Sequence, residues 1–320
     1  MGIGAEYDVM AEQTEQEKTH VQAIRAMASD HPDDAIRFLC SSIASGYRCA
    51  LVLLTDIIDG ASRPLGALMA IREDGHYIGL VSGGCVEASL VTEACSAIDE
   101  GCDRQSRYGK GSPWFDIVLP CRGGIGLHIH VVRDNHPLGD FLGLREQRRA
   151  ATLFYDTRTE SLVCKAVYAP TGWEGPVFMA GFRPDPQIIL FGDGLESVFL
   201  VSLAEAAQVR VIRNDIEAVC LHAKDQETAI IILHHDPDLE IPVLEAALQT
   251  NAFFIGCLGS RKTQQRRLSR LRNKGHDAAQ LARIHGPIGL FGPSREARSV
   301  AISVLAELFA LIEARKTGSS

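Results

Sequence analysis

The second half of the chain alternates short apolar segments with helical ones, and this alternation limits the fold more than any other feature of the sequence. The predicted strands are 187–191, 209–212, 229–233 and 253–256, and the predicted helices are 195–207 and 239–249. Strands that alternate with helices build βαβ units and a parallel sheet. We therefore predict that residues 184–320 form a Rossmann-like domain with a parallel sheet.

The first half of the chain lacks this regular alternation. Its predicted helices are 33–45 and 86–99, and its predicted strands are 48–56, 67–72, 77–81, 115–119, 127–132, 152–156 and 162–168. Asp74-Gly75 is a typical tight turn between two of these strands. Arg183-Pro184-Asp185-Pro186 has two prolines in three residues, which indicates a linker. We therefore predict an α/β protein whose N-terminal mixed α/β domain covers residues 31–183, after a flexible leader of residues 1–30.

The composition is that of a globular protein of about two domains. The 320 residues are 46% hydrophobic and 22% charged, and the net charge of −8 gives no reason to expect nucleic acid or an anionic membrane as a partner. No run of about 18 apolar residues predicts a membrane helix, and residues 1–18 lack the pattern of a signal peptide. The nine cysteines include no Cys-x-x-Cys pair, so we expect reduced thiols in a cytoplasmic protein.

The first candidate site is Ser82-Gly83-Gly84-Cys85-Val86-Glu87, which lies between a predicted strand and a predicted helix. Paired glycines let the backbone turn sharply and let a ligand come close. The start of the helix offers free N–H groups and a partial positive charge, which favour anions. A cysteine at this position is expected to have a lowered thiol pKa and to be a better nucleophile or metal ligand. The alternative is a buried structural cysteine in a tight turn.

Two further loops of the first domain carry candidate residues. Cys121-Arg122-Gly123-Gly124 again places a cysteine beside paired glycines, and the two cysteine sites are expected to converge on one ligand across neighbouring strand ends. Arg63 lies in the Gly/Pro-rich loop 59–66, where an arginine can hold a phosphate or carboxylate through two hydrogen bonds. The alternatives are an ordinary loop for Cys121 and a solvated side chain for Arg63.

In the second domain, Gly192-Asp193-Gly194-Leu195-Glu196-Ser197 approaches the dinucleotide-binding pattern Gly-x-Gly-x-x-Gly. Ser197 stands where the third glycine belongs, and Asp193 is expected to repel a phosphate. The acid that would bind a ribose is replaced by Arg213, with Asp215 two positions later. We interpret this segment as a Rossmann turn with weakened dinucleotide binding, or alternatively as a purely structural turn.

Gly259-Ser260-Arg261-Lys262 opens a basic helix, and a Gly-Ser-Arg segment after a strand can bind phosphate. Arg266, Arg270 and Lys274 share one helix face. This face is either solvated or a docking surface for an acidic partner or a phosphorylated cofactor. For the nearby segment His234-His235-Asp236, a capping or supporting role is favoured over metal binding.

With these residues identified, residues 35–310 resemble the XdhC/CoxI family of xanthine dehydrogenase accessory proteins. In the first domain the resemblance rests on Ser62-Arg63-Pro64-Leu65-Gly66-Ala67, Asp74-Gly75, Ser82-Gly83-Gly84-Cys85-Val86-Glu87 and Cys121-Arg122-Gly123-Gly124. In the second domain it rests on Leu233-His234-His235-Asp236, Gly256-Cys257-Leu258-Gly259-Ser260-Arg261, Gly286-Pro287-Ile288-Gly289-Leu290, Ala301-Ile302-Ser303 and Ala306-Glu307. The sequence departs from the family at Asp193-Gly194-Leu195, at Arg213 and at Glu296-Ala297-Arg298-Ser299.

The resemblance implies a chaperone that binds molybdenum cofactor, as molybdopterin or its cytosine dinucleotide, supports its sulfuration by a cysteine desulfurase and delivers it to the large subunit of a molybdenum hydroxylase. Because molybdenum favours sulfur ligands, we expect Cys85 and Cys121 to contact the metal. The other expected cofactor-binding residues are Ser82, Gly83, Gly84, Glu87, Arg63, Gly192, Gly194, Ser260 and Arg261.

Two enzyme hypotheses remain beside the chaperone, which we expect to be a non-catalytic maturation factor and a homodimer. An NAD(P)-dependent oxidoreductase would use the Rossmann-like domain but would leave Cys85 without a role. A cysteine-nucleophile enzyme needs a base near Cys85, for which His76 and His128 are the nearest candidates.

Overall fold

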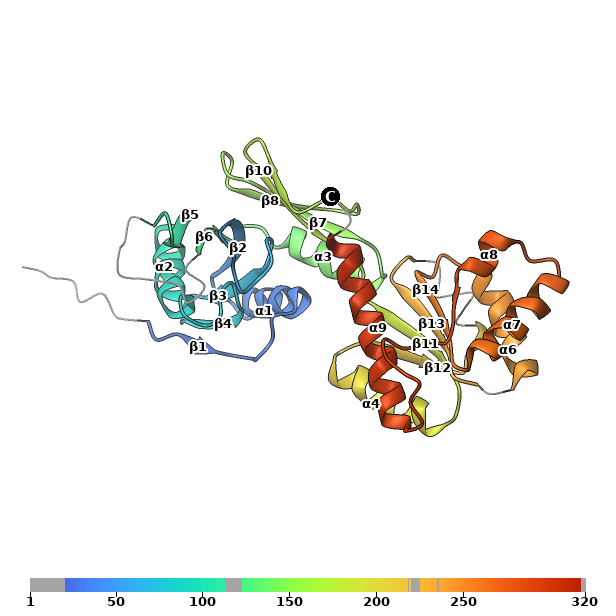
Figure 1. Ribbon diagram of the computed structural model, residues 1–320. Helices are drawn as coiled ribbons and strands as arrows, with labels where there is room; N and C mark the ends of the chain where they lie inside the picture. Colours follow the sequence, from blue (N-terminus) through green and yellow to red (C-terminus); the bar gives the residue numbers. More distant parts are fainter. Residues whose placement is uncertain (1–20, 113–122, 218, 220–224, 235, 318–320) are drawn as a thin grey trace, which may run out of the picture. The chain divides into compact units, whose positions relative to one another are not determined.

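The computed structural model describes residues 21–112, 123–217, 219, 225–234 and 236–317, which form two compact units (Figure 1). The first unit contains the chain up to Leu142 together with Leu153–Cys164 and Thr171–Ala180. The second contains Gly143–Thr152, Lys165–Pro170 and the chain from Gly181 onward. No helix among the described residues is long and apolar enough to cross a membrane.

A six-stranded sheet forms the centre of the first unit. Its strand order is β1 (Ile24–Arg25), β4 (His76–Gly79), β3 (Leu68–Arg72), β2 (Cys49–Ile58), β6 (Gly124–Val131) and β5 (Arg104–Gly109). Strand β1 pairs parallel to β4, and all the other neighbours are antiparallel. The mixed α/β character predicted for this half is therefore confirmed.

The two faces of this sheet differ in chemistry because successive strand residues point to opposite sides. On one face, Val52 and Leu54 of β2 and Leu127 and Ile129 of β6 pack against helix α2 (Glu87–Glu100) in one apolar cluster. The other face carries Leu51 and Leu53 together with the intervening histidines of β6, His128 and His130. Helix α1 (Pro32–Ala44) contacts β2, β3 and β4.

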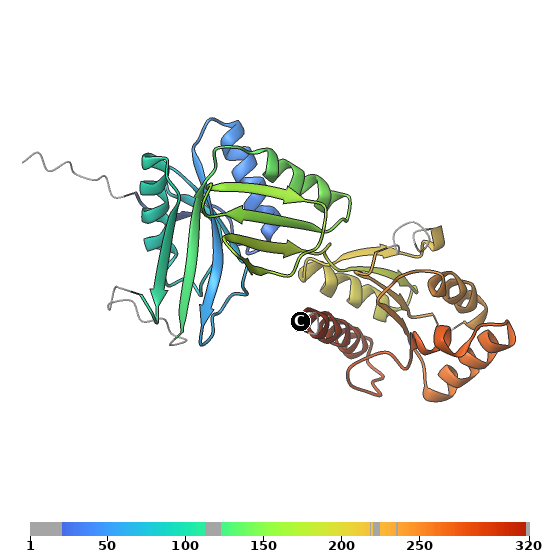
Figure 2. The same ribbon diagram turned by 90° about the horizontal axis from the view of Figure 1, so that it is seen from above.

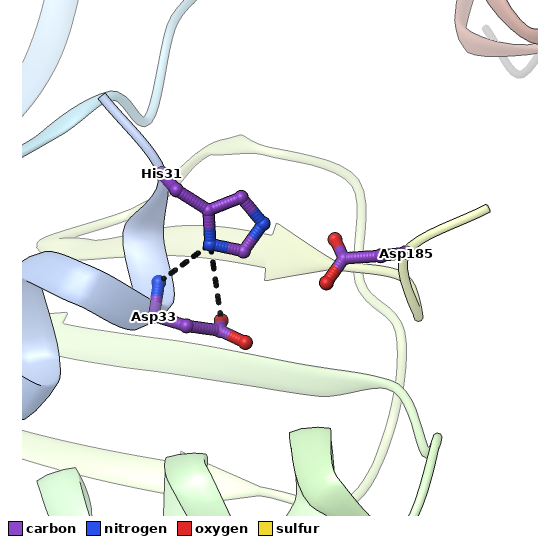
Figure 3. Close-up of side chains that lie close together, drawn as sticks. All are labelled: His31, Asp33 and Asp185. Atoms are coloured by element: carbon purple, nitrogen blue, oxygen red, sulfur yellow. Dashed lines mark hydrogen bonds and ion pairs between the residues drawn. The ribbon is translucent and has the colours of Figure 1, made fainter. Parts of the chain in front are cut away.

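Helix α1 begins at the position that its sequence favours. His31 is the N-cap, and its Nδ1 atom accepts a hydrogen bond of 3.2 Å from the backbone N–H of Asp33 (Figure 3). Pro32 occupies the first turn, where its missing N–H costs no hydrogen bond. The acidic residues Asp33 and Asp34 lie in the same turn, where their negative charge interacts favourably with the positive end of the helix dipole.

A second, four-stranded sheet follows helix α3 (His136–Glu146). Its strand order is β8 (Ser161–Lys165), β7 (Ala151–Asp156), β10 (Val177–Phe182) and β9 (Gly172–Glu174). A polar layer joins its β7 to the histidine face of the first sheet. Asp103 accepts hydrogen bonds from Tyr155 Oη (2.8 Å), the Val131 N–H (2.9 Å) and Arg133 (2.9 Å), and its carboxylate lies 2.7 Å from His130 Nδ1.

The second unit contains a five-stranded parallel sheet, which confirms the predicted Rossmann-like domain (Figure 2). The strand order is β12 (Arg210–Arg213), β11 (Gln187–Phe191), β13 (Thr228–Ile232), β14 (Phe254–Cys257) and β15 (Ile284–His285). One face packs against α4 (Leu195–Ala206) and α9 (Ala297–Thr317). The other packs against α6 (Pro237–Leu248), α7 (Arg261–Asn273) and α8 (Ala278–Ala282).

The proline-rich segment 183–186 is held by hydrogen bonds within the second unit. Arg145, which is almost fully buried, donates to the Arg183 carbonyl and lies 2.5 Å from the Asp185 carboxylate. Arg148 donates to the Asp185 carbonyl (2.9 Å) and pairs with Asp225 (2.8 Å). The segment is therefore anchored to the end of α3 and the loop after it.

Several elements differ from the sequence-based expectations, among them two strands that are short or polar. Residues 24–25, expected within the leader, form β1 because they pair with His76 and Tyr77. Strand β5 has the polar sequence Arg-Gln-Ser-Arg-Tyr-Gly and lies at a sheet edge, so no apolar pattern predicted it. Strands β9 and β10 were not predicted either. The predicted strand 115–119 and residues 1–20 of the leader lie outside the described residues.

Candidate functional site

The candidate loops of the first unit all leave one edge of the six-stranded sheet. Because β2 runs antiparallel to β3 and β6, and β3 runs antiparallel to β4, the ends of β2 and β4 meet the starts of β3 and β6. Strand β1 runs parallel to β4 and ends at the same edge. We call this region, formed by loops 26–31, 59–67 and 80–86 and by Gly123, the loop edge.

Contacts within the loop edge bring the predicted sites together. Ser62 Oγ lies only 3.6 Å from where a Cβ on Gly83 would stand. Arg63 forms an ion pair with Asp30. Gly123 is packed so closely that a Cβ there would overlap the Gly60 carbonyl and lie 2.6 Å from that of Ile58. The Cys85 loop and Gly123 therefore each contact the segment 58–62, while Cys121 lies outside the described residues, so the expected convergence of the two cysteines stays a prediction.

Two buried side chains, Ser82 and Glu87, hold the loop that contains Cys85. Glu87 accepts hydrogen bonds from the Ser82 N–H (2.9 Å) and hydroxyl (2.7 Å) and from the N–H groups of Val81 (3.3 Å) and Val86 (3.2 Å). Ser82 Oγ in turn accepts from the N–H groups of Gly84 (3.1 Å) and Cys85 (3.2 Å). Both residues therefore point into the loop and fix its shape.

This network changes the expected role of the helix start. Five of the six backbone N–H groups from Val81 to Val86 already donate to Ser82 or Glu87. The Glu87 carboxylate lies where an anionic ligand would interact with the helix dipole. These N–H groups are therefore not available to a phosphate, contrary to the expectation from the sequence.

The loop instead presents an exposed thiol beside bare backbone. Gly83, Gly84 and Cys85 are all exposed, and a Cβ on Gly84 would meet no atom within 4 Å. By contrast, Cys257 is fully buried in the second unit, where burial raises the pKa of its thiol to about 12. The alternative of a buried structural cysteine is therefore wrong for Cys85 and describes Cys257.

Among the described residues, Arg63 of loop 59–67 and Lys110, which follows β5, are cations at the loop edge. Arg63 is half-buried, and its partner Asp30 is exposed. Lys110 forms an ion pair with Asp59, and both side chains are exposed. The sequence analysis missed Lys110, although its position between Gly109 and Gly111 is a recognisable signal of a lysine in a glycine turn. An anionic ligand could interact with either cation by competing with an exposed carboxylate.

The two proposed bases for Cys85 lie on the wrong side of the sheet. Cys85 precedes α2, which packs on the apolar face, whereas His128 points from the opposite face. His128 Nδ1 is 3.0 Å from Thr55 Oγ1, and burial lowers the pKa of the imidazole. On β4, Tyr77 packs against the apolar cluster beneath α2. Because successive strand residues point to opposite sides of the sheet, its neighbour His76 points away from α2. Neither histidine can therefore activate Cys85 directly.

In the second unit, the glycine turn after β11 is occupied by its own side chains. Asn214 accepts a hydrogen bond from the Gly192 N–H (2.9 Å) and donates to Asp193 (2.5 Å), and Arg213 lies 4.0 Å from Asp193. Ser197 Oγ would lie 2.9 Å from a Cβ on Gly192. Gly194 is the N-cap of α4 and is exposed. This polar network occupies the region where a dinucleotide's ribose and phosphate would bind, which disfavours the oxidoreductase alternative.

The basic helix α7 is less accessible than its sequence indicated. Ser260 caps it by accepting from the Thr263 N–H (3.1 Å), and Arg261 is exposed. Arg267 is buried and forms an ion pair with buried Glu240. Arg270 and Lys274 pair with α6 acids, namely Asp238 (3.3 Å) and Glu245 (2.9 Å). The face predicted as solvated or as a docking surface is therefore partly neutralised by α6, which the sequence spacing alone did not reveal.

The segment after β13 supports a helix. Asp236 caps α6, and its carboxylate accepts from the Asp238 N–H at 2.9 Å. This confirms a capping role within His234-His235-Asp236, while His235 lies outside the described residues.

Comparison with known families gives two matches along the chain. The XdhC and CoxI family matches residues 42–109, which include loops 59–67 and 80–86 of the loop edge. The XdhC Rossmann domain matches residues 188–308 of the parallel-sheet unit.

Individual relatives extend these matches over most of the chain. The molybdenum cofactor insertion chaperone PaoD of Escherichia coli (strain K12) is 43% identical over 285 residues, which cover 89% of this chain and 90% of PaoD. A probable xanthine dehydrogenase component of Bacillus subtilis (strain 168) is 25% identical over 83% of this chain and 93% of its own length. A solved structure from Bacillus halodurans, described as a xanthine dehydrogenase, covers 89% of this chain and 98% of its own chain at 20% identity. Its TM-score of 0.69 shows that the two proteins share a fold.

Proposed function

Because the chain belongs to the XdhC and CoxI family, we propose that it binds a molybdenum cofactor and inserts it into a molybdenum hydroxylase of the xanthine dehydrogenase or aldehyde/CO dehydrogenase type. The observation that carries this proposal is the 43% identity with PaoD along nearly the full length of both chains. The chain acts as a maturation factor in this proposal, and the cofactor is its cargo.

The loop edge has the donor set that such a cargo requires. The exposed Cys85 thiol is a soft ligand of the kind that molybdenum favours, and bare Gly83 and Gly84 allow close approach to the backbone. Arg63 provides a guanidinium for a phosphate. We propose that Cys85 and Cys121 contact the metal, and that Ser82 and Glu87 act indirectly by holding Cys85 in place.

Further parts of the proposal concern the second unit and the partners. Gly194 and Arg261 are exposed and are the candidates of the second unit for binding a phosphate, whereas the Gly192 N–H and Ser260 Oγ are already bonded to Asn214 and to the Thr263 N–H. The proposed partners are a cysteine desulfurase that supports sulfuration and the large subunit of the hydroxylase. We further propose a cytoplasmic homodimer.

The proposal is tested by reconstitution of an apo-hydroxylase with cofactor-loaded protein. Activity is expected to saturate at about one carrier per active site, because each transfer empties one molecule. If a substoichiometric amount reactivated the whole pool without free cofactor or a recharging enzyme, the carrier proposal would fail.

Cysteine variants test the site separately. Cys85→Ser and Cys121→Ser are expected to lose bound pterin, measured by its fluorescence after oxidation. Cys102→Ser is the matched control, because Cys102 is also exposed but follows the far end of α2. Full retention of pterin by the Cys85→Ser/Cys121→Ser double variant would contradict the proposed ligands.

The oxidoreductase alternative is tested by calorimetry with NAD and NADP. We expect no NAD binding tighter than about 10 μM, roughly −7 kcal/mol, because Asp193 and Asn214 occupy the turn. Tighter binding would revive the alternative. Binding of NADP alone would indicate Arg213 as a partner of the 2′-phosphate.

A further inference from the structure

Trp173 of β9 is an exposed aromatic side chain whose position is fixed by its neighbours. The side chain is 38% exposed, although tryptophan is among the largest apolar side chains. Its Nε1–H donates a hydrogen bond of 3.2 Å to the carbonyl of Thr55, near the end of β2. The indole is therefore held in one orientation while a large part of it remains accessible.

No ring contact described for Trp173 is a parallel stack. The His128 ring lies 5.3 Å away at an interplanar angle of 67°, and the Phe178 ring lies 5.2 Å away at 62°. Both are edge-type contacts, in which the ring planes are far from parallel. These contacts help to hold the indole in one orientation.

The residue just before β9, Thr171, touches the loop of Arg63. A Cβ on Gly66 would lie 2.8 Å from Thr171 Cγ2, two residues before Trp173. The Gly66 N–H donates to the Leu54 carbonyl at 2.8 Å, next to Thr55. Within the loop 59–67, Gly66 therefore contacts Thr171, just before β9, and Ser62 lies close to Gly83 of the diglycine loop. Arg63 lies between these two residues in the sequence.

From this arrangement we infer that Trp173 is a stacking platform for the flat heteroaromatic ring of a pterin, with Arg63 as the partner of an acidic group on the same ligand. The inference rests on the proposed function, in which the cargo contains a pterin. Aromatic side chains bind heteroaromatic rings by stacking in a way that tolerates different substituents. Trp173 would thus recognise the part of the cargo that the cysteines do not contact.

Fluorescence titration with pterin-6-carboxylate tests the inference. The chain has two tryptophans, so the Trp114→Phe variant reports on Trp173 alone. Its emission is expected to be quenched in a saturable way by the pterin. In the wild-type background, Trp173→Leu is expected to weaken pterin binding about ten-fold, and Trp173→Phe by less, because a phenyl ring still stacks.

The matched control is Tyr47→Leu. Tyr47 is also 38% exposed, but it precedes β2 and so lies at the edge of the six-stranded sheet opposite the loop edge. Its substitution is expected to leave pterin binding unchanged. Arg63→Gln is expected to weaken binding of pterin-6-carboxylate but not of a pterin without the carboxylate, which a purely structural role would not produce.

The possible results separate the inference from the proposed function. Equal pterin affinity in Trp173→Leu and wild type, or no quenching of Trp173, would overturn the inference even if cofactor transfer succeeds. Quenching that depends on Trp173 would support it even if no hydroxylase is reactivated, in which case the carrier proposal alone fails.

Discussion

Glu87 is the residue through which the structure makes its sharpest prediction. We expect Glu87→Ala to leave the Ser82 N–H and hydroxyl without their acceptor, since these are its two shortest hydrogen bonds, at 2.9 and 2.7 Å. Leaving a buried polar group unsatisfied costs about 1–3 kcal/mol, so the free energy of unfolding should fall by about 3 kcal/mol. For a unit of this size that corresponds to a decrease in Tm of roughly 6–12 °C.

Glu87→Gln should have a smaller effect, about 1–2 kcal/mol, because its carbonyl oxygen still accepts from the backbone while its amide cannot accept from Ser82. The matched control is Glu100→Gln at the other end of α2, where the side chain is exposed and pairs only at the surface with Arg104. This change should cost less than about 0.5 kcal/mol.

The assay is urea unfolding, combined with hydrogen exchange of residues 81–86. If Glu87→Ala unfolds at the same urea concentration as Glu100→Gln, and its loop exchanges no faster than wild type, the role assigned to Glu87 is wrong. A second expected result is a changed rate of Cys85 alkylation in Glu87→Ala, because Ser82 would no longer be fixed against the Cys85 N–H.

Three other predictions follow from buried contacts. Gly123→Ala should lower the free energy of unfolding by about 1–3 kcal/mol, because the new methyl group would overlap the Gly60 carbonyl; a wild-type unfolding curve would contradict this packing. Arg267→Met should lower the free energy of unfolding by about 3–5 kcal/mol, because Glu240 would stay buried without its partner, and the double variant Arg267→Met/Glu240→Leu should recover most of this loss. Thermal unfolding measures both variants, and no recovery in the double variant would argue against the ion pair. Burial lowers the pKa of His128 in the folded protein, so the unfolded chain binds more protons below about pH 6.5, and the free energy of unfolding should fall as the pH decreases through that range. The slope of this free energy against pH should be smaller in His128→Gln, and an unchanged slope would refute the assignment.

The parallel sheet of the second unit was predictable because its central strands β11 and β13 are almost entirely apolar. Residues 187–191 and 228–232 are buried at every position, and a continuous apolar run is the pattern of a strand covered on both faces. In contrast, β1 has two residues and β5 is polar. Such strands form because neighbouring strands supply hydrogen-bond partners for their backbone. The hydrophobic pattern of the short segment itself does not reveal which strands will be its neighbours.

The candidate site was predictable in its location but not in its internal chemistry. The glycines at 83, 84 and 123 indicated loops at the ends of strands, and the sheet topology brings those loops to one edge. The sequence did not show that Glu87 turns back to bind the N–H groups of its own loop. Nor did it show that α6 supplies acids to α7, because Asp238 and Arg270 are 32 residues apart.

The anchoring of the proline-rich segment 183–186 affects how this gene can recombine with its relatives. A crossover placed at the two prolines lies in the segment that the sequence predicts as a linker. It would, however, combine Arg145 and Arg148 from one parent with Asp185 and Asp225 from the other. Chimeras joined there should therefore be more stable when one parent supplies both arginines and the other supplies both aspartates.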